Sequence, residues 1–217
     1  MTINESELSS LSAKLKSNIN TFVTDANSAI NSYTAKVNTI WCSPKSKELG
    51  GTIKSCLTNT DSKINTRWFS SGNSGINGGI RINVQNFNSV EKTNFSWNTV
   101  SFEEPQVGNI QSKINEKFPN GHAGVMEGSK VSELDGLFDA ITNTYVNLFK
   151  NFTSTVSSSD AFSPAQKSAL VSGFTSSSGE LSKVMEQIKT EIHTVFSKED
   201  IVQAELESTN KSNAKGI

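Results

Sequence analysis

Residues 8–41 read LSSLSAKLKSNINTFVTDANSAINSYTAKVNTIW, and this stretch decides the fold. A series of apolar residues advances along it in steps of 3, 4 and 4, repeated three times without interruption. An eleven-residue repeat gives about 3.67 residues per turn, which keeps one apolar stripe on one side of an α-helix. Because the stripe is narrow, we expect this helix to lie against a partner. The stripe consists of Leu8, Leu11, Leu15, Ile19, Phe22, Ala26, Ile30, Tyr33, Val37 and Trp41.

A bend is predicted directly after this helix, in the sequence IWCSP at residues 40–44. Ser43 is a favourable N-cap residue, and Pro44 suits the first position of a second helix. The residue before a proline disfavours the α conformation, so the first helix cannot continue through Ser43. A connection this short predicts an antiparallel helical hairpin over residues 1–66, with Trp41 at the bend.

A second helical hairpin is predicted over residues 129–200. Its first helix carries the stripe Phe138, Ile141, Tyr145, Leu148 and Phe152. Its second helix follows a bend made by Phe162, Ser163 and Pro164, and carries the stripe Leu181, Val184, Ile188 and Ile192. Residues 201–217 lack this periodicity and are predicted to form a polar tail.

The two hairpins share one order of features: a striped helix, an aromatic residue at the bend, a Ser-Pro pair and a second striped helix. One interpretation is a duplicated helical hairpin. The other is that Ser-Pro is simply a common way to begin a helix.

The segment between the hairpins, residues 67–128, shows a different pattern. Residues 80–84 alternate between apolar and polar side chains, and so do residues 95–99 before a shift of phase like that of a bulge. These patterns predict a small β-hairpin or sheet, followed by an irregular stretch. The expected fold is therefore mainly α with a β insertion, in which two long antiparallel hairpins form a four-helix-bundle-like domain.

Residues suited to catalysis or metal binding are scarce. The two histidines, His122 and His193, have no other ligand at metal-binding spacing, and we interpret them as exposed polar residues. Glu103 and Glu104 are interpreted as solvated charges, because neighbouring residues of a strand point to opposite faces. Trp68 and Trp97 are suited to stacking on bases, but without nearby basic residues we expect them to pack internally. We expect a protein without catalytic residues, metal or cofactor.

Composition favours protein partners. Charged residues make up 19% of the chain with a formal net charge of −1, so nucleic acid is not expected as a partner. No stretch approaches 18 consecutive apolar residues, so no membrane span is expected. The polar and acidic residues 1–10 do not have the pattern of a signal peptide, which predicts synthesis in a bacterial cytoplasm and, if the protein is exported, a route independent of such a signal.

The first hairpin resembles the WxG-type helical-hairpin proteins of type VII secretion. The resemblance covers residues 5–66 and centres on Trp41, but this chain has Trp-Cys-Ser where the family has Trp-x-Gly. The family's Tyr-x-x-x-Asp/Glu signal is also absent in strict form, since residues 196–200 read FSKED. The resemblance implies export by a type VII-like system as a helical partner or effector carrier.

Two functions from different classes follow. We favour a structural protein that packs through its helical stripes into a homo-oligomer or against neighbouring subunits, as a bacteriophage virion component. The alternative is the WxG-like exported protein, which predicts a co-secreted helical partner. In both, association through the helix stripes carries the function.

Overall fold

The regular elements of this chain are helical in the part that the computed structural model describes, residues 3–40, 44–70, 72–107 and 131–215. Side chains are described in these ranges except at 38–40, 44–49, 131–132, 195–207 and 210–215. The elements are α1 (Glu5–Ile40), α2 (Pro44–Ile64), a short π-helix η1 (Asn65–Phe69), α3 (Gly75–Glu91), α5 (Val131–Ser158) and α6 (Pro164–Lys215).

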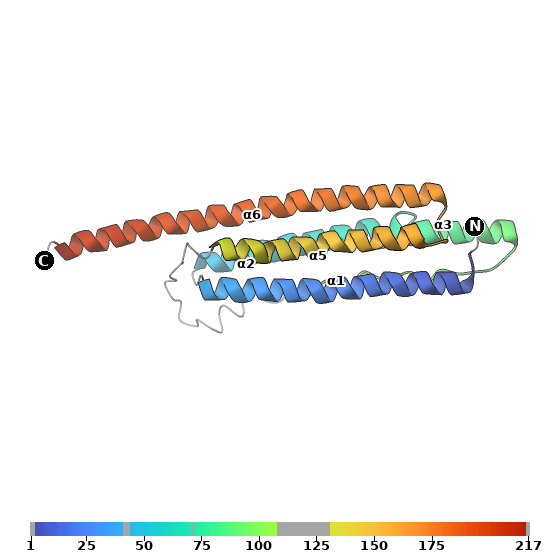
Figure 1. Ribbon diagram of the computed structural model, residues 1–217, viewed down its shortest axis with the longest axis horizontal. Coiled ribbons are helices and arrows are strands. Elements are labelled where there is room, and N and C mark those ends of the chain that lie inside the picture. Colours follow the sequence, from blue (N-terminus) through green and yellow to red (C-terminus); the bar gives the residue numbers. More distant parts are fainter. Residues whose placement is uncertain (1–2, 41–43, 71, 108–130, 216–217) are drawn as a thin grey trace.

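The helices form an elongated bundle with α5 at its centre (Figure 1). α1 is antiparallel to α5, because Phe22 contacts Tyr145 while Tyr33, farther along α1, contacts the earlier residue Phe138. α5 and α6 form an antiparallel hairpin, and α6 covers the opposite side of α5. This arrangement places α5 between α1 and α6, so that the first helix of the second hairpin packs against the first helix of the chain.

α2, η1 and α3 follow one another end to end and make the fourth rod of the bundle (Figure 1). They run parallel to α5, because Asp61 contacts Tyr145 and Phe69 contacts Phe152 in the same order. α2 buries Ile53, Leu57 and Ile64 at helical spacing. Two shorter helices joined by a π-helix thus match the length of one long helix.

The centre of the bundle is aromatic. Rings from α1, η1, α5 and α6 meet there with centroids about 5–6 Å apart, a spacing at which aromatic pairs attract beyond their area burial. The cluster consists of Phe22, Trp68, Phe69, Phe102, Tyr145, Phe149, Phe152 and Phe174.

The predicted β insertion is wrong: among the described residues of the segment 67–128 there is no strand, and α3 occupies residues 75–91. Ile80, Ile82 and Val84 do alternate, but Ile76, Ile80 and Val84 also repeat at a spacing of four, and these three are the buried apolar residues of α3. The four-residue spacing is the one that lets the apolar side chains share one face of the helix and point into the bundle. Residues 108–128 of the predicted insertion lie outside the described residues.

Two glycines fix the turn that leads into α3. Gly75 has φ +73°, a left-handed conformation that glycine adopts without strain. A Cβ atom on Gly78 would overlap the backbone of Asn73, so only a glycine at this position lets the chain fold back so closely. These positions explain why a Gly-rich stretch, which usually indicates a loop, leads directly into a helix.

Residues 93–107, which we call the strap, run back along the bundle in an extended conformation. Phe102 of the strap contacts Phe22 of α1 on one side and Phe69 of η1 on the other, with ring centroids 5.8 and 5.5 Å apart. The strap therefore fills the seam between α1 and the η1–α3 rod. The strand predicted at residues 95–99 is therefore wrong: these residues lie in the strap and pair with no strand in the described part of the chain.

Two asparagines of α3 hold the backbone of the strap in place of a neighbouring strand. Asn77 donates to the carbonyl of Val100 (2.9 Å) and accepts from its amide (3.0 Å). Asn88, three helical turns later, pairs in the same way with the carbonyl (2.8 Å) and amide (3.0 Å) of Phe95. Buried backbone groups need such partners, so these side chains replace a sheet.

α6 continues as a helix through the predicted polar tail as far as Lys215. Asp135 of α5 pairs with His193 of α6, and α5 begins four residues earlier, at Val131. In this antiparallel register the start of α5 lies opposite residue 197. Figure 1 accordingly shows α6 running past the ends of α1, α2 and α5.

Candidate binding groove

The predicted packing stripes of α1 and α5 lie in the core. Each is nearly fully buried, with 0–5% exposure, while the residues between them are mostly exposed. These residues are Leu8, Leu11, Leu15, Ile19, Phe22, Ile30, Tyr33, Val37, Phe138, Ile141, Tyr145, Leu148 and Phe152. They are committed to the interior of this chain, so they do not provide a free surface for a partner.

The stripe of α6 needs one correction. Leu181, Ile188 and Ile192 are buried, but Val184 is 38% exposed, and Met185 takes the core position at 1% exposure. The buried positions advance in steps of 4, 3 and 4, and a residue one place earlier is rotated by about 100° around the helix. Val184 therefore lies at the edge of α6 and not in its packed stripe.

Of the two predicted bends, the one at residues 162–164 lies fully within the described residues. Phe162 is 3% exposed, and Ser163 and Gln166 form a capping box in which the Ser163 hydroxyl accepts from the Gln166 amide at 3.3 Å. Pro164 is the first residue of α6, as the N-terminal preference of proline predicts. Pro44 is likewise the first residue of α2, whereas Trp41 and Ser43 lie outside the described residues.

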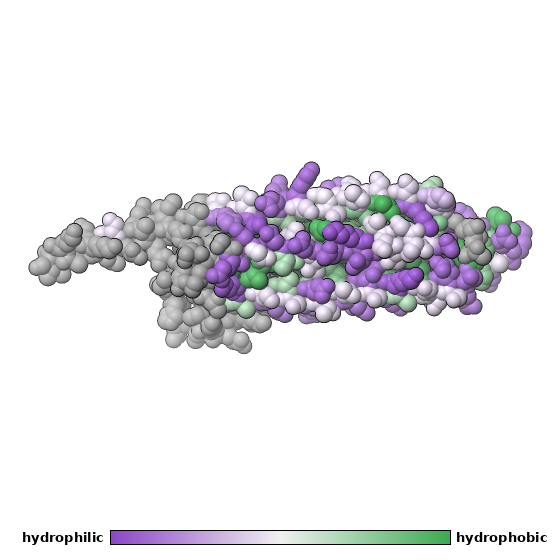
Figure 2. All heavy atoms as spheres, in the orientation of Figure 1, coloured by the Kyte–Doolittle hydropathy of each residue, from purple (hydrophilic) through white to green (hydrophobic). Residues whose placement is uncertain are grey.

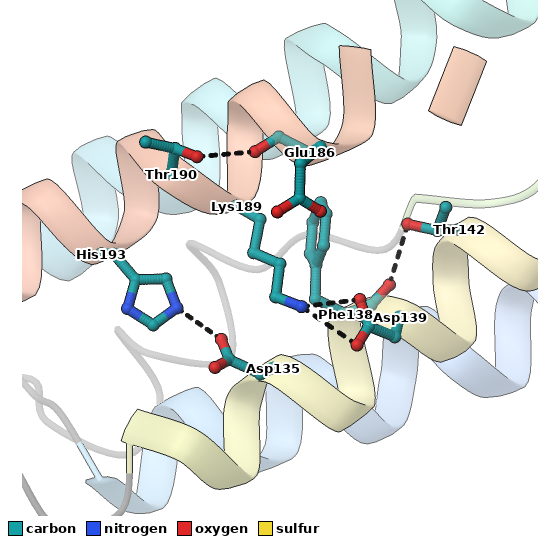
Figure 3. Close-up of polar contacts among 8 residues, drawn as sticks. All are labelled: Asp135, Phe138, Asp139, Thr142, Glu186, Lys189, Thr190 and His193. Atoms are coloured by element: carbon teal, nitrogen blue, oxygen red, sulfur yellow. Dashed lines mark hydrogen bonds and ion pairs between the residues drawn. The ribbon is translucent and has the colours of Figure 1, made fainter. Parts of the chain in front are cut away.

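Polar contacts tie α5 to α6 near one end of the bundle (Figure 3). The Lys189 ammonium donates to both carboxylate oxygens of Asp139, at 2.9 and 3.0 Å, and His193 contacts Asp135 at 2.5 Å. His193, interpreted from sequence as an exposed polar residue, is therefore part of an interhelical pair. No group of three metal-binding side chains is found in the described part of the chain.

One buried polar pair lies at the centre of the bundle. The Tyr145 hydroxyl donates to Asp61 Oδ1 at 2.9 Å, and both residues are almost fully buried. Burial raises the pKa of Asp61 to about 7, with a smaller contribution from Glu104, although the Tyr145 hydrogen bond acts in the opposite direction. Burial also raises the pKa of Tyr145. The pair is enclosed by the aromatic cluster, so we interpret it as structural.

A groove of about 450 Å³ lies between the α2–η1 junction and α6. Its floor is apolar and consists of Ile64, Trp68, Phe149, Leu181 and Val184. Its rim is polar and consists of Thr60, Ser62, Lys63, Thr66, Arg67 and Glu180, and the buried Ser177 lines the groove from α6. We call this feature the π-helix groove.

The π-helix creates the groove by turning two aromatic residues into the core at once. Trp68 and Phe69 are adjacent in sequence and both are buried, Trp68 against Phe174 of α6 and Phe69 against Phe152 of α5. Trp68 reaches α6 where Gly173 leaves room, because a Cβ atom there would lie 2.6 Å from its ring. The Trp68 ring packs on Gly173 and Phe174 and thereby separates the end of α2 from α6 beside the groove.

The rim of the groove carries two cations and one anion. Arg67 pairs with Glu180 across the groove at 3.5 Å and lies 5.2 Å from the centre of the Trp68 ring. Lys63 stands one turn earlier on α2. No histidine, cysteine or paired carboxylate lines the groove, so its residues are suited to binding and not to acid–base or nucleophilic chemistry.

Sequence patterns did not indicate this groove. Trp68 was recognised only as an aromatic residue expected to pack internally, and Arg67 marked the point where the helical pattern ended. The available signal was the pair of adjacent aromatic residues directly after a helical stripe, which a π-helix can bury together.

No family model matches this chain, and no curated protein or solved structure matches it. The resemblance to WxG-type proteins therefore stays a prediction that rests on residues 5–66 alone. Among the described residues, no helix is both long and apolar enough to cross a membrane.

Proposed function

We propose that this chain is a non-enzymatic structural protein that assembles with copies of itself or with neighbouring subunits. The observation that carries the proposal is α6, a 52-residue helix that extends past the other described helices of the bundle (Figure 1). Isolated helices are marginally stable in water, and most helices in proteins owe their stability to packing. The extension is therefore suited to lie against a neighbouring subunit.

The surface of the bundle supports an assembly role more than a catalytic one. Over the coloured part of the face shown in Figure 2, hydrophilic and intermediate residues predominate, with hydrophobic residues in small separate areas. Asp61 and Tyr145, whose pKa values are raised by burial, are hydrogen-bonded to each other inside the core. Such a bundle is a rigid, solvated rod on which a projecting helix can present a contact surface.

Between the two biological settings, we propose a bacteriophage virion component, because the packing differs from that of a separate WxG-type hairpin. A WxG-type hairpin implies two helices that pack mainly on each other. Here α1 has its extensive contacts with α5, and the strap separates it from η1 and α3. The helices α1 and α2 are thus part of one larger bundle and do not form a separate hairpin unit.

The assembly role is tested by the mass of the protein in solution. Light scattering over a concentration series compares the full chain with a variant that ends at Ser197, where the register of α5 ends. We expect a stable oligomer for the full chain and a folded monomer for the shortened one, with circular dichroism as the control for folding. A full chain that stays monomeric at all concentrations contradicts the proposal.

The biological setting is tested separately, by finding where the protein is located. An antibody against the chain should detect it in purified phage particles in a fixed ratio to the main capsid protein. Detection in the culture medium of uninfected cells, together with a co-secreted helical protein, would instead support the exported alternative.

A further inference from the structure

We propose that the π-helix groove binds a small amphipathic anion, with its apolar part against Trp68 and Leu181 and its carboxylate at Arg67 and Lys63. The site is distinct from the assembly surface, because it lies beside the aromatic centre of the bundle and not on the extension of α6. A ligand with an aliphatic chain and one terminal carboxylate fits this division of apolar and charged residues.

Size and composition support a small ligand. The volume of about 450 Å³ falls within the range of roughly 300–1,000 Å³ that ligand sites occupy. An apolar floor with a few polar groups at the rim is also the usual composition of such sites. On α6 the groove spans only residues 177–184, about 12 Å of helix, which is too short a seam for a docked helix.

A buried polar atom in the groove lacks a partner. Ser177 lines the groove at 8% exposure, and its hydroxyl makes no hydrogen bond in the described structure. A buried hydroxyl without a hydrogen bond destabilises a protein, so such groups normally find a partner. Two other such atoms, on Asn27 and Tyr33, lie outside the groove, so the Ser177 hydroxyl adds a possible ligand contact to the argument from the shape and charges of the groove.

The charges at the rim select an anion. The Arg67–Glu180 pair is long, at 3.5 Å, and both side chains are more than half exposed, so solvent weakens it. A guanidinium group has five donors and binds a carboxylate through two parallel hydrogen bonds. Arg67 can therefore donate hydrogen bonds to a ligand carboxylate while it stays stacked on the Trp68 ring. With Lys63, the groove has two positive charges and one negative charge, that of Glu180.

The experiment measures dodecanoate binding to the full chain by isothermal titration calorimetry, below the concentration at which dodecanoate forms micelles. Val184→Trp places a ring in the groove from an exposed position, so it should abolish binding without disturbing the core. Val90→Trp is the matched control, because Val90 is 75% exposed on α3 and does not line the groove.

Two further comparisons separate the charge from the apolar floor. Arg67→Gln should weaken dodecanoate binding about tenfold, as expected for loss of a charged hydrogen bond. Dodecan-1-ol, which has the same chain without the carboxylate, should bind more weakly than dodecanoate and should be insensitive to Arg67→Gln.

The proposal is supported by saturable binding of one dodecanoate per chain that Val184→Trp removes and Val90→Trp preserves. It is overturned if the folded full chain does not bind dodecanoate, or if Val184→Trp leaves binding unchanged. Equal affinity for dodecanoate and dodecan-1-ol in the wild type overturns the assignment of the anion. Neither result depends on the oligomeric state, which light scattering on the same samples reports.

Discussion

Asn77 joins three segments of the chain through one side chain. It donates to the carbonyls of Phe69 and Val100 and accepts from the Val100 amide and the Trp97 ring nitrogen, over distances of 2.9–3.1 Å. Asn77 is 1% exposed, so Asn77→Ala leaves these groups without partners and without water. We expect a loss of about 3–5 kcal/mol in the free energy of unfolding, measured by urea denaturation.

Asn88→Ala is the matched control for this prediction. Asn88 makes the same pair of contacts with Phe95 but is only half-buried, so water can replace the lost hydrogen bonds and the loss should be about 1 kcal/mol. Equal losses in the free energy of unfolding for the two variants would show that burial does not determine how strongly these asparagines hold the strap.

Asp61 gives the core a dependence on pH that differs from that of ordinary carboxylates. Its pKa rises from 3.8 to about 7 on burial, so the folded state keeps the proton over a range in which the unfolded state has lost it. The contribution of this group to stability is therefore fully present below about pH 4 and is lost as pH rises to about 7. One pKa unit corresponds to about 1.4 kcal/mol, which makes the full effect a few kcal/mol.

Asp61→Asn isolates this effect, because the amide oxygen can still accept from Tyr145 but the side chain does not titrate. We expect the stability difference, wild type minus variant, to fall between pH 4 and pH 7 and to stay constant above that range. Taking the difference cancels the other carboxylates. Thermal unfolding at fixed ionic strength measures it, and a flat difference from pH 4 to pH 8 would contradict the assignment.

At the scale of the element, α6 contains two glycines with opposite roles. A Cβ atom on Gly173 would lie 2.6 Å from the Trp68 ring, whereas one on Gly179 would meet nothing within 4 Å. Trp68 cannot move aside easily, because it packs on Phe174 at a centroid distance of 4.7 Å. Overpacking typically costs about 1–3 kcal/mol, and replacing a helical glycine by alanine gains about 0.5–1 kcal/mol.

We therefore expect Gly173→Ala to destabilise the protein by about 1–2 kcal/mol and Gly179→Ala to stabilise it by about 0.5–1 kcal/mol. Both are exchanges of glycine for alanine in one helix, so the difference reports only the space around each site. Guanidinium denaturation of the two variants measures it. Stabilisation by both would mean that Trp68 does not occupy the space beside Gly173.

The long helices were predictable because their patterns are local. In α1 the eleven-residue repeat places each stripe residue on one face, and that face is buried. α3 was not predictable in this way: a five-residue alternation and several glycines indicated a strand and a loop, while its helical stripe includes Asn77 and Asn83, which are polar. Their role depends on contacts with Val100 and with Ala161, 23 and 78 residues away.

The groove was not predictable from the sequence for a related reason. It exists because a π-helix turns Trp68 toward a glycine of α6 that lies more than a hundred residues later. Neither the change of helical pitch nor the facing glycine carries a local signal. Residue patterns indicated which side chains are apolar, but not where two helices would be held apart.

On the scale of the whole molecule, the bundle changes character along its length. Its middle is held by the aromatic cluster around Tyr145 and Phe152, to which all four rods and the strap contribute rings. The end at which α5 begins is held by charged pairs, including Lys36 with Glu133 and Lys189 with Asp139. The first zone excludes water, and the second remains in contact with it.

This division predicts a local response to salt. Exposed ion pairs are worth roughly 0–1 kcal/mol each and weaken as the Debye length falls from about 10 Å at 0.1 M salt to about 3 Å at 1 M. Hydrogen exchange measured by mass spectrometry at these two salt concentrations should therefore accelerate in residues 133–140 and 186–194. Residues 145–156 and 170–177, enclosed by aromatic contacts, should keep their protection.

Asp139→Asn provides the control, because it removes one charged pair and leaves the buried stripe of α5 intact. The variant should exchange faster at low salt in the same two segments and should respond less to added salt than the wild type does. Faster exchange in the middle of the bundle at high salt would contradict the division, since it would mean that the charged end and the aromatic centre open together as one cooperative unit.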